Sequence, residues 1–516
     1  MAVALTVVVL ALHLLRALHA GALWRDEAAA VGLATLPTVA EVYAAFPHEA
    51  FPLLFPLAVR AQAALAGDRD AAWRGFGLGI GAALLAALWL GARLGPAGGG
   101  STPLASLVLL GLSPAVLRWG DEVRGYGLGS VLLVLAFAAT ARAVGRPSRA
   151  AAVAAWLAGL GAAHCLFQSS ALLAGLGSAA AVAAWRRAGW RAAAAVLAGG
   201  AAIAASLLPY AAPLRAAREW DRVARSPLDA GQLWDGLRQA LGPAWHQAGW
   251  ALALALAAAA AICAMVAGRR REQLLFCGLT VVLGAAAFAG FLGVLGYAPR
   301  PWYYLPLLAL LAAACDLALA GAAWPLRAAL AAGAVAAVFG LLGPAADAAR
   351  TRATNVDQLA AVVAEGAAPG DLVLVNPWTC GISFRRYYRG PAPWTTLPEI
   401  GDLRFHRYDL LKAKMASPHP IDGVIDRLGR TLRGGHRVWL VGGVGLARTP
   451  APVVPLPPAP HAPAGWFDLP YTLSWSRQAG AFLQAHAVEW QGVRLSGGDP
   501  IDPLERLPLL SAYGWK

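Results

Sequence analysis

Long runs of apolar residues recur along most of this chain, and they restrict its fold more than any other feature. Of its 516 residues, 59% are hydrophobic and only 14% are charged. A soluble protein of this size cannot hide so much apolar surface, and runs of roughly twenty residues match the thickness of a bilayer. We therefore expect an α-helical polytopic membrane protein with about eleven transmembrane helices. The expected spans lie near residues 3–23, 75–93, 103–119, 127–144, 150–167, 169–185, 192–209, 247–267, 274–295, 304–321 and 327–345.

Arginines distinguish the two sides of this membrane topology. They cluster in alternate loops between the expected spans, which is typical of cytoplasmic loops. The residues concerned are Arg93; Arg142, Arg146 and Arg149; Arg186, Arg187 and Arg191; Arg269, Arg270 and Arg271; and Arg327. The alternation predicts a cytoplasmic N-terminus, with the first span retained as an anchor, and an external C-terminal part. Because these loops account for much of the formal charge of +14, we expect no nucleic-acid binding.

The character of the chain changes after about residue 345, which predicts a transmembrane domain (1–345) and an extracytoplasmic α/β domain (346–516). In the second domain, helical patterns alternate with short apolar runs that are typical of strands. The expected helices are 355–365 and 422–432, the expected strands are 372–375 and 437–441, and proline-rich residues 450–465 are expected to form an extended connector.

Two segments do not follow the simple topology. Residues 51–66 are short for a span and contain Pro52 and Pro56, so we expect a juxtamembrane or re-entrant helix on the outer side. Residues 210–246 are rich in arginine, yet the alternation places them outside. This loop either binds an anionic substrate or is a solvated connector, and the sequence favours neither.

An acidic pair, Asp26-Glu27, directly follows the first span and lies beside Trp24, a residue type that anchors helices at the membrane interface. Carboxylates at a membrane edge are costly unless they are hydrated, paired or functional. A carboxylate there is suited to act as general base toward an acceptor hydroxyl or amine. The alternative is a solvated pair at a helix end.

A second polar cluster, Asp121-Glu122-Val123-Arg124-Gly125-Tyr126, follows a later span. A guanidinium binds phosphate through its planar fork of donors, and the carboxylates and the tyrosine hydroxyl add further polar groups. The alternative is a local ion pair that holds a tight loop.

Four motifs in a fixed order carry a family resemblance. They are Leu23-Trp24-Arg25-Asp26-Glu27, Phe51-Pro52-Leu53-Leu54-Phe55, Asp121-Glu122-Val123-Arg124-Gly125-Tyr126 and Arg300-Pro301-Trp302-Tyr303-Tyr304-Leu305-Pro306. Together with the topology, they resemble the GT-C superfamily of membrane glycosyltransferases. The branch concerned comprises bacterial relatives of protein O-mannosyltransferases and of the aminoarabinose transferases that modify lipid A. The resemblance covers residues 1 to about 345 and extends loosely into the external part.

The resemblance implies an inverting transferase of the bacterial inner membrane, with an external active site and a sugar donor on a polyprenyl phosphate. The implied acceptor is a lipid, a glycan or a protein, and the sequence leaves the sugar open. Asp26 matches the first-loop catalytic aspartate, and Glu27, Asp121 and Glu122 are further catalytic candidates. The candidates for binding the donor phosphate are Arg124, Tyr126, Arg300 and Tyr303.

Three further residues are weaker candidates: His48, Glu49 and His164. The stretch His48-Glu49-Ala50-Phe51-Pro52-Leu53 departs from the family's His-Pro-Pro-Leu motif, which leaves its role open. His164 lies at a helix end, where hydrogen-bonded structural histidines are common. A divalent cation is compatible with these side chains, although their spacing does not indicate a metal site.

Two other classes of protein fit parts of the pattern. A lipid or glycan transporter would explain the many spans, and it would carry ionisable residues in mid-bilayer and an inverted repeat, neither of which the sequence indicates. A membrane-anchored binding protein acting through its external domain would not need Asp26.

Overall fold

The polypeptide divides into two compact units that do not follow the order of the chain. The computed structural model describes residues 1–49, 51–94, 101–221, 229–266, 268, 271–296, 298–320, 324–447, 453–459, 467–495 and 498–516. The helix bundle comprises Met1–His19, Phe51–Ala211 and Ser226–Arg350, and the sheet unit comprises Ala20–Ala50, Ala212–Arg225 and Thr351–Lys516. This grouping places the first loop with the C-terminal residues, whereas the expected boundary near residue 345 placed it with the spans.

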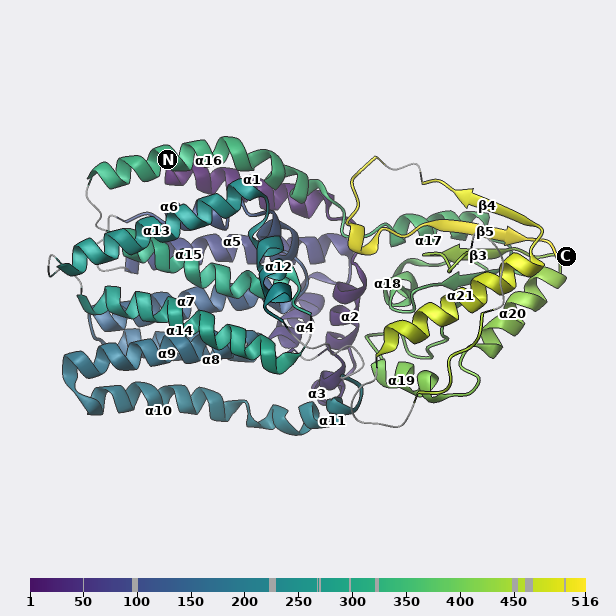
Figure 1. Cartoon of the computed structure of the whole chain (residues 1–516), viewed down its shortest axis with the longest axis horizontal. Helices are drawn as coiled ribbons and strands as arrows, with labels where there is room; N and C mark the ends of the chain where they lie inside the picture. The colour runs from purple at the N-terminus through teal and green to yellow at the C-terminus, as the bar shows by residue number, and fades with distance from the viewer. Residues whose placement is uncertain are drawn as a thin grey trace. The chain divides into compact units, whose positions relative to one another are not determined.

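The helix bundle contains the membrane-crossing elements of the fold. Within the described residues, nine helices are long and apolar enough to cross a membrane. Seven lie in α1 (Ala2–His19), α5 (Asp70–Leu94), α7 (Gly125–Gly145), α9 (Phe167–Ala188), α13 (Ala244–Val266), α14 (Arg271–Leu295) and α16 (Trp324–Arg350) (Figure 1). The other two are longer helical runs: Trp190–Ala217, which begins with α10 (Trp190–Ser206), and Pro301–Leu319, which ends with α15 (Leu305–Leu319). A further apolar helix, α8 (Arg149–Cys165), has 17 residues. The predicted polytopic architecture is therefore confirmed.

One expected span, residues 103–119, is wrong as a continuous helix. Helix α6 (Leu104–Leu109) ends after six residues, and the chain re-forms only a π-helical turn, η1 (Val116–Gly120). Two local causes are visible. Pro114 has no N–H to donate within a helix, and Gly111 packs so closely on Val9 of α1 that a side chain there would collide with it. Apolar composition alone did not reveal this interruption.

The segments between the long helices form five shorter helices: α4 (Leu54–Ala66) and α12 (Ala230–Leu241) in the bundle, α2 (Arg25–Ala34) and α3 (Val39–Glu49) in the sheet unit, and α11 (Ala211–Asp221), which begins at the boundary between the units. Helix α4 is apolar but has only 13 residues, and it begins just after Pro52. It is too short to span a bilayer, as expected for this segment. Helices α11 and α12 form part of the basic loop, in which Arg222 and Arg225 lie outside the described residues.

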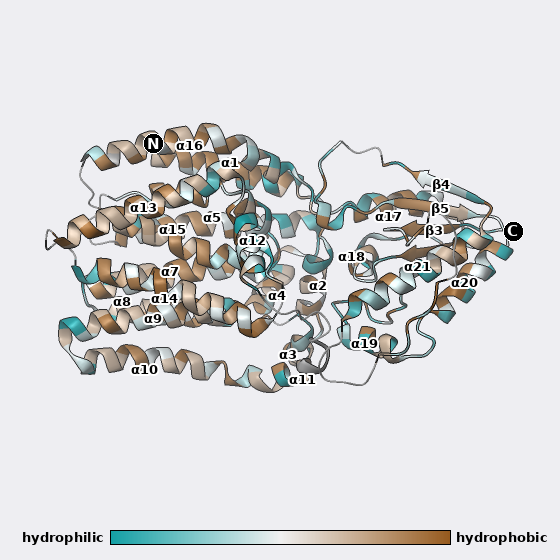
Figure 2. Cartoon of the chain, in the orientation of Figure 1, coloured by the Kyte–Doolittle hydropathy of each residue, from teal (hydrophilic) through white to brown (hydrophobic). Residues whose placement is uncertain are grey.

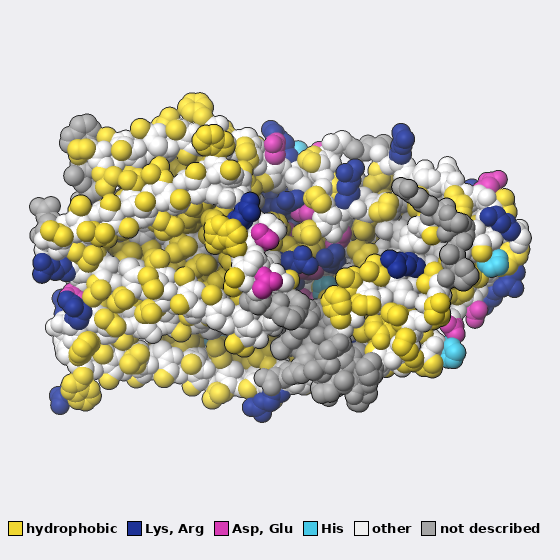
Figure 3. Space-filling view, in the orientation of Figure 1, with side chains coloured by type: hydrophobic (Ala, Val, Ile, Leu, Met, Phe, Trp, Pro, Cys, Tyr) yellow, Lys and Arg dark blue, Asp and Glu magenta, His cyan; other side chains and the backbone are white. Residues whose placement is uncertain are grey.

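The surface of the long helices is predominantly apolar. Figure 2 shows hydrophobic residues along most of their length. On the face drawn in Figure 3, hydrophobic side chains cover the bundle helices almost continuously. Inside the bundle, α1, α5, α6 and α16 share a core that includes Leu5, Val9, Leu85, Leu107 and Leu341. An apolar exterior around an apolar core is what a lipid environment requires.

The sheet unit is built on five strands in the order β2-β1-β3-β5-β4. The strands are β1 (Leu372–Val375), β2 (Trp394–Thr396), β3 (Val438–Val441), β4 (Glu489–Val493) and β5 (Leu509–Tyr513). Strand β1 pairs in parallel with β2 and β3, and β5 pairs antiparallel with both β3 and β4. Strands β1 and β3 lie where the sequence predicts them.

Helices cover both faces of this sheet (Figure 1). Helices α17 (Val356–Gly366) and α18 (Cys380–Tyr387) pack on one face, and the first-loop helix α2 packs against α18. Helix α20 (Asp422–Arg433) covers the other face, with α19 (Tyr408–Ala416) and α21 (Asp468–His486) beside it. Helices α17 and α20 confirm the predicted α/β domain. Of the expected connector 450–465, residues 453–459 are described and form no helix or strand, and the rest lies outside the described residues.

Candidate active site

The acidic pair of the first loop lies at the beginning of α2. Asp26 is the second residue of this helix, and its side chain is 18% exposed. Glu27 is fully buried, and the backbone N–H of Trp24 donates a hydrogen bond to its carboxylate at 3.3 Å. Glu27 therefore satisfies a backbone donor at the helix start, while Asp26 keeps access to solvent. A catalytic role for Glu27 stays a prediction.

A histidine that the sequence analysis missed joins Asp26 to Glu49. The Nδ1 atom of His406 lies 2.6 Å from Glu49 Oε1, and its Nε2 atom lies 3.6 Å from Asp26 Oδ1. The His406 and Glu49 side chains are only 9% and 5% exposed. Two carboxylates and an imidazole so arranged form a potential proton-transfer chain. We call Asp26, His406 and Glu49 the acid–histidine cluster.

The sheet explains why His406 lies in this place. In open α/β sheets, functional side chains gather beyond the carboxyl ends of the parallel strands. Trp378 follows β1 and Tyr408 comes soon after β2, and their rings are 5.6 Å apart. The His406 ring stacks on Tyr408 at 5.9 Å and meets the edge of Trp378 at 6.3 Å. Aromatic packing thus fixes the imidazole that faces the first loop.

His48 lies in the same unit but has a different environment. Its ring stacks on Phe405 at 5.3 Å, and its Nδ1 atom is 3.8 Å from Asp409. Burial lowers the pKa of His48, which favours the neutral imidazole. Asp409 is engaged by Arg407 at 2.6 Å, and Arg407 also reaches Asp402. His48 therefore borders an ion-pair network and does not extend the acid–histidine cluster.

Among the described residues of this region, the donor atoms do not assemble a metal site. Carboxylates and imidazoles are suitable ligands for several divalent cations. Throughout the described part of the chain, however, no group of three His, Cys, Asp or Glu side chains is arranged to hold a metal ion.

The second polar cluster forms a separate constellation within the helix bundle. The Arg124 guanidinium lies 4.6 Å above the Phe51 ring, and Phe51 packs edge-on against Tyr126 at 5.8 Å. Tyr126 in turn lies 6.0 Å from Tyr303. The structure thus brings together three of the motifs that the sequence placed far apart. Arg300, the fourth phosphate-binding candidate, is exposed and directly precedes the 3₁₀ turn η4 (Pro301–Tyr304).

The loop that carries Arg124 is tightly packed, which fixes its position. The Asp121 carboxylate lies 2.7 Å from the His13 ring of α1. Gly77 of α5 and Gly127 of α7 face the carbonyls of Asp121 and Gly120 so closely that a Cβ at either glycine would collide with them. Asp121, Glu122 and Arg124 are all buried. Asp121 is therefore engaged with His13, and its catalytic role, like that of Glu122, stays a prediction.

His164 is hydrogen-bonded at both ring nitrogens. Nδ1 lies 3.1 Å from Tyr210 Oη, and Nε2 lies 2.9 Å from Ser206 Oγ. Tyr210 also accepts the backbone N–H of Leu53 at 3.1 Å. These contacts connect α8, the end of α10 and the proline-containing segment, so they favour a structural role for His164.

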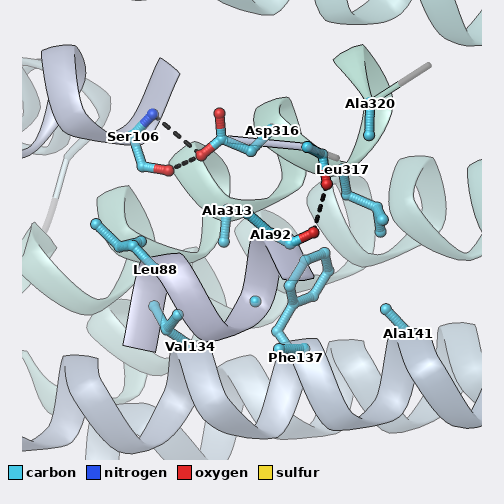
Figure 4. Close-up of a pocket in the computed structure, with 13 residues that line it drawn as sticks. Leu88, Ala92, Ser106, Val134, Phe137, Ala141, Ala313, Asp316, Leu317 and Ala320 are labelled. Atoms are coloured by element: carbon cyan, nitrogen blue, oxygen red, sulfur yellow. Dashed lines mark hydrogen bonds between the residues drawn. The ribbon is translucent and has the colours of Figure 1, made fainter. Parts of the chain in front are cut away.

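An aspartate within the apolar helices bears on the transporter alternative. Asp316 lies in the last turn of α15 and accepts the backbone N–H groups of Ala105 and Ser106 at 2.9 and 3.2 Å, together with the Ser106 hydroxyl. Asp316 also lines a cavity of about 30 Å³ together with Phe137 and Leu88. Figure 4 shows these side chains. Because its oxygens satisfy the free amides of the broken span, Asp316 has a structural explanation that requires no transport path.

Comparison with known proteins identifies the fold. Neither a protein-family model nor a curated protein matches the sequence. The crystal structure of ArnT from Cupriavidus metallidurans bound to undecaprenyl phosphate matches with a TM-score of 0.51 at 15% identity, covering 85% of this chain and 92% of that chain. The apo structure of that ArnT gives a TM-score of 0.48 at 14% identity, covering 85% and 91%. The first match shows that this chain shares the fold of that ArnT, which confirms the predicted fold class, a polytopic helical membrane protein with a C-terminal α/β domain.

Proposed function

We propose that this multi-pass membrane protein, which has the fold of ArnT, is an inverting glycosyltransferase. It would move a sugar from a polyprenyl-phosphate donor to an acceptor at the outer face of a bacterial inner membrane. The observation that carries the proposal is the acid–histidine cluster, in which a partly exposed Asp26 faces an oriented imidazole. The undecaprenyl phosphate bound in ArnT supports the donor class.

In the proposed reaction, Asp26 accepts the proton of an acceptor hydroxyl or amine. The acceptor atom attacks the anomeric carbon from the face opposite the phosphate, and the bond between that carbon and the phosphate oxygen breaks. The polyprenyl phosphate leaves with the bonding electron pair. His406 donates its Nδ1–H to Glu49, which leaves Nε2 to take the proton onward from Asp26.

The departing phosphate needs positive charge and hydrogen-bond donors. The Arg124 guanidinium lies over the Phe51 ring. The rings of Tyr126 and Tyr303, each of which carries a hydroxyl, pack in the same cluster of aromatic side chains. A fixed guanidinium stabilises a phosphate more strongly as charge grows on it in the transition state. We assign Arg124, Tyr126 and Tyr303 to the donor phosphate, and Arg300 remains the fourth candidate.

The test is incubation of the purified protein with a panel of polyprenyl-phosphate sugars. Release of polyprenyl phosphate supports the proposal if NMR of the product shows that the configuration at the anomeric carbon has been inverted. Asp26→Asn should reduce the rate by about 100- to 10,000-fold. Glu41→Gln is the matched control, because Glu41 is an exposed acid of the same loop. If proteoliposomes containing the protein instead moved intact donor across their membrane without releasing polyprenyl phosphate, the transporter alternative would be established.

A further inference from the structure

The first turn of α2 is held by a residue near the end of the chain. The backbone N–H of Arg25 lies 3.2 Å from both carboxylate oxygens of Glu505, across 480 positions of sequence. Glu505 ends the 3₁₀ turn η5 (Pro503–Glu505), and its side chain is fully buried. The Ser383 hydroxyl donates to the same carboxylate at 3.2 Å. A buried acid thus supplies the acceptor that the free amide at the helix start needs.

Arg25 connects this buried acid to the proposed base. One guanidinium nitrogen lies 3.6 Å from Glu505 Oε2, and Nε lies 3.6 Å from Asp26 Oδ1. Both separations exceed the 2.7–2.9 Å that is typical of a charge-assisted hydrogen bond. Arg25 is therefore shared between two carboxylates and makes a close pair with neither.

The segment around Glu505 is rigidly supported. Asp502 accepts the backbone N–H of Leu504 at 2.9 Å, and the Asn355 amide makes two hydrogen bonds of 2.9 Å to the backbone of Leu507. On the other side, the backbone N–H of Leu23 donates to Tyr387 Oη at 2.7 Å. The entry to α2 is thus held by two separate parts of the C-terminal domain, η5 through Glu505 and α18 through Tyr387.

We propose that Glu505 is a positioning residue for Asp26. It anchors the first turn of α2 and draws the Arg25 guanidinium away from the Asp26 carboxylate, which keeps that carboxylate available to accept a proton. This inference rests on the proposed transferase function. Without the Glu505 charge, Arg25 would close on Asp26 as a bidentate pair and make it a weaker base.

The other charged and titratable groups of the sheet unit are consistent with this role. Asp26 faces Arg25, His406 and Tyr408, and Glu505 faces Arg25, Asp26 and the Cys380 thiol. Burial raises the pKa of Glu505 to about 7, against the opposing attraction of Arg25. The anchoring carboxylate therefore gains its charge as the pH rises through neutrality.

The experiment compares Glu505→Gln with the double variant Arg25→Gln/Glu505→Gln. Glu505→Gln should lower kcat at least tenfold with little change in donor KM, and it should move the acid limb of the kcat profile to lower pH. Removing Arg25 as well should restore much of the lost rate, because no cation then closes on Asp26. Glu489→Gln, on the exposed face of β4, is the matched control.

A merely structural role for Glu505 predicts a different pattern. In that case the acid limb would not move and the double variant would be no better than Glu505→Gln, which would overturn the proposal. If Glu505→Gln does not fold, Arg25→Gln alone decides, because removing the cation should move the acid limb to higher pH and an unmoved limb would contradict us.

Hydrogen exchange separates failure of this proposal from failure of the proposed function. Amides at the start of α2 should exchange faster in Glu505→Gln than in the unsubstituted protein, even if no donor is turned over. Unchanged exchange there, with full activity of Glu505→Gln, would refute the positioning role while leaving the transferase intact.

Discussion

His406 offers a decisive test of the acid–histidine cluster, because two substitutions remove different parts of its function. His406→Asn places an amide N–H close to the position of Nδ1, so the hydrogen bond to Glu49, now 2.6 Å, can be kept. The same change removes the Nε2 atom that faces Asp26 at 3.6 Å. His406→Ala removes both contacts.

The expected magnitudes follow from these contacts. Loss of a proton-transfer partner typically costs about 100- to 10,000-fold in rate, so both variants should lose at least 100-fold in kcat. Glu49 is only 5% exposed. Losing the imidazole hydrogen bond to this carboxylate, which then keeps the weaker backbone N–H of residue 406 at 3.4 Å, should therefore lower the free energy of unfolding of His406→Ala by about 1.5–3 kcal/mol relative to His406→Asn.

The assay is single-turnover release of polyprenyl phosphate, with thermal melting measured on the same preparations. His419→Asn is the matched control, since His419 is 75% exposed and pairs only locally with Asp422. A well-folded His406→Asn protein that retains wild-type turnover would refute the proton-transfer role. Equal losses of stability in both variants would show that the Glu49 hydrogen bond is not maintained by asparagine.

Three further predictions concern topology, donor binding and pH. Reporter fusions after Arg187 should indicate the cytoplasm and fusions within the C-terminal domain the exterior; a cytoplasmic C-terminal domain would contradict the external site. Arg300→Lys should be partly active and Arg300→Ala much worse, with Arg124 following the same order, because lysine keeps the charge but loses the two-pronged geometry. Unchanged donor affinity in both alanine variants would remove them from the phosphate site. Since burial raises the pKa of Glu505 from 4.5 to about 7, the folded form binds its proton more tightly, and stability should fall as the pH rises across this window. Glu505→Gln should lack that decline. If the melting temperatures of both proteins changed with pH in the same way, the assignment of this pH dependence to Glu505 would be wrong.

Local patterns predicted the elements whose character is set by their own residues. The long apolar helices follow from composition, and strands β1 and β3 follow from short buried runs of valine and leucine, with Trp439 in β3. The interruption between α6 and η1 was missed, because Gly111 and Pro114 lie in a run that is apolar except for Ser106 and Ser113. The close approach of Gly111 to α1 is a tertiary contact, which hydropathy does not record.

Contacts over long sequence separations could not be predicted in this way. His406 lies near Asp26, and Glu505 accepts the backbone N–H of Arg25, although hundreds of residues separate the partners in sequence. His406 stands in a segment dense with arginine and aromatic residues, Arg404-Phe405-His406-Arg407-Tyr408, which was the available signal. That signal gave no partner for the histidine, since the partners are contributed by the first loop.

The 480-residue separation between Arg25 and Glu505 also imposes an order in time. At roughly 5–20 residues per second, a ribosome completes Glu505 about 25–95 s after Arg25. During that interval, α1 and the later spans can enter the bilayer while the start of α2 has no acceptor from η5. A nascent chain therefore passes through a long stage in which its proposed base is already synthesised but not yet positioned. Maturation of the site should therefore wait until Glu505 has been synthesised and has reached the start of α2.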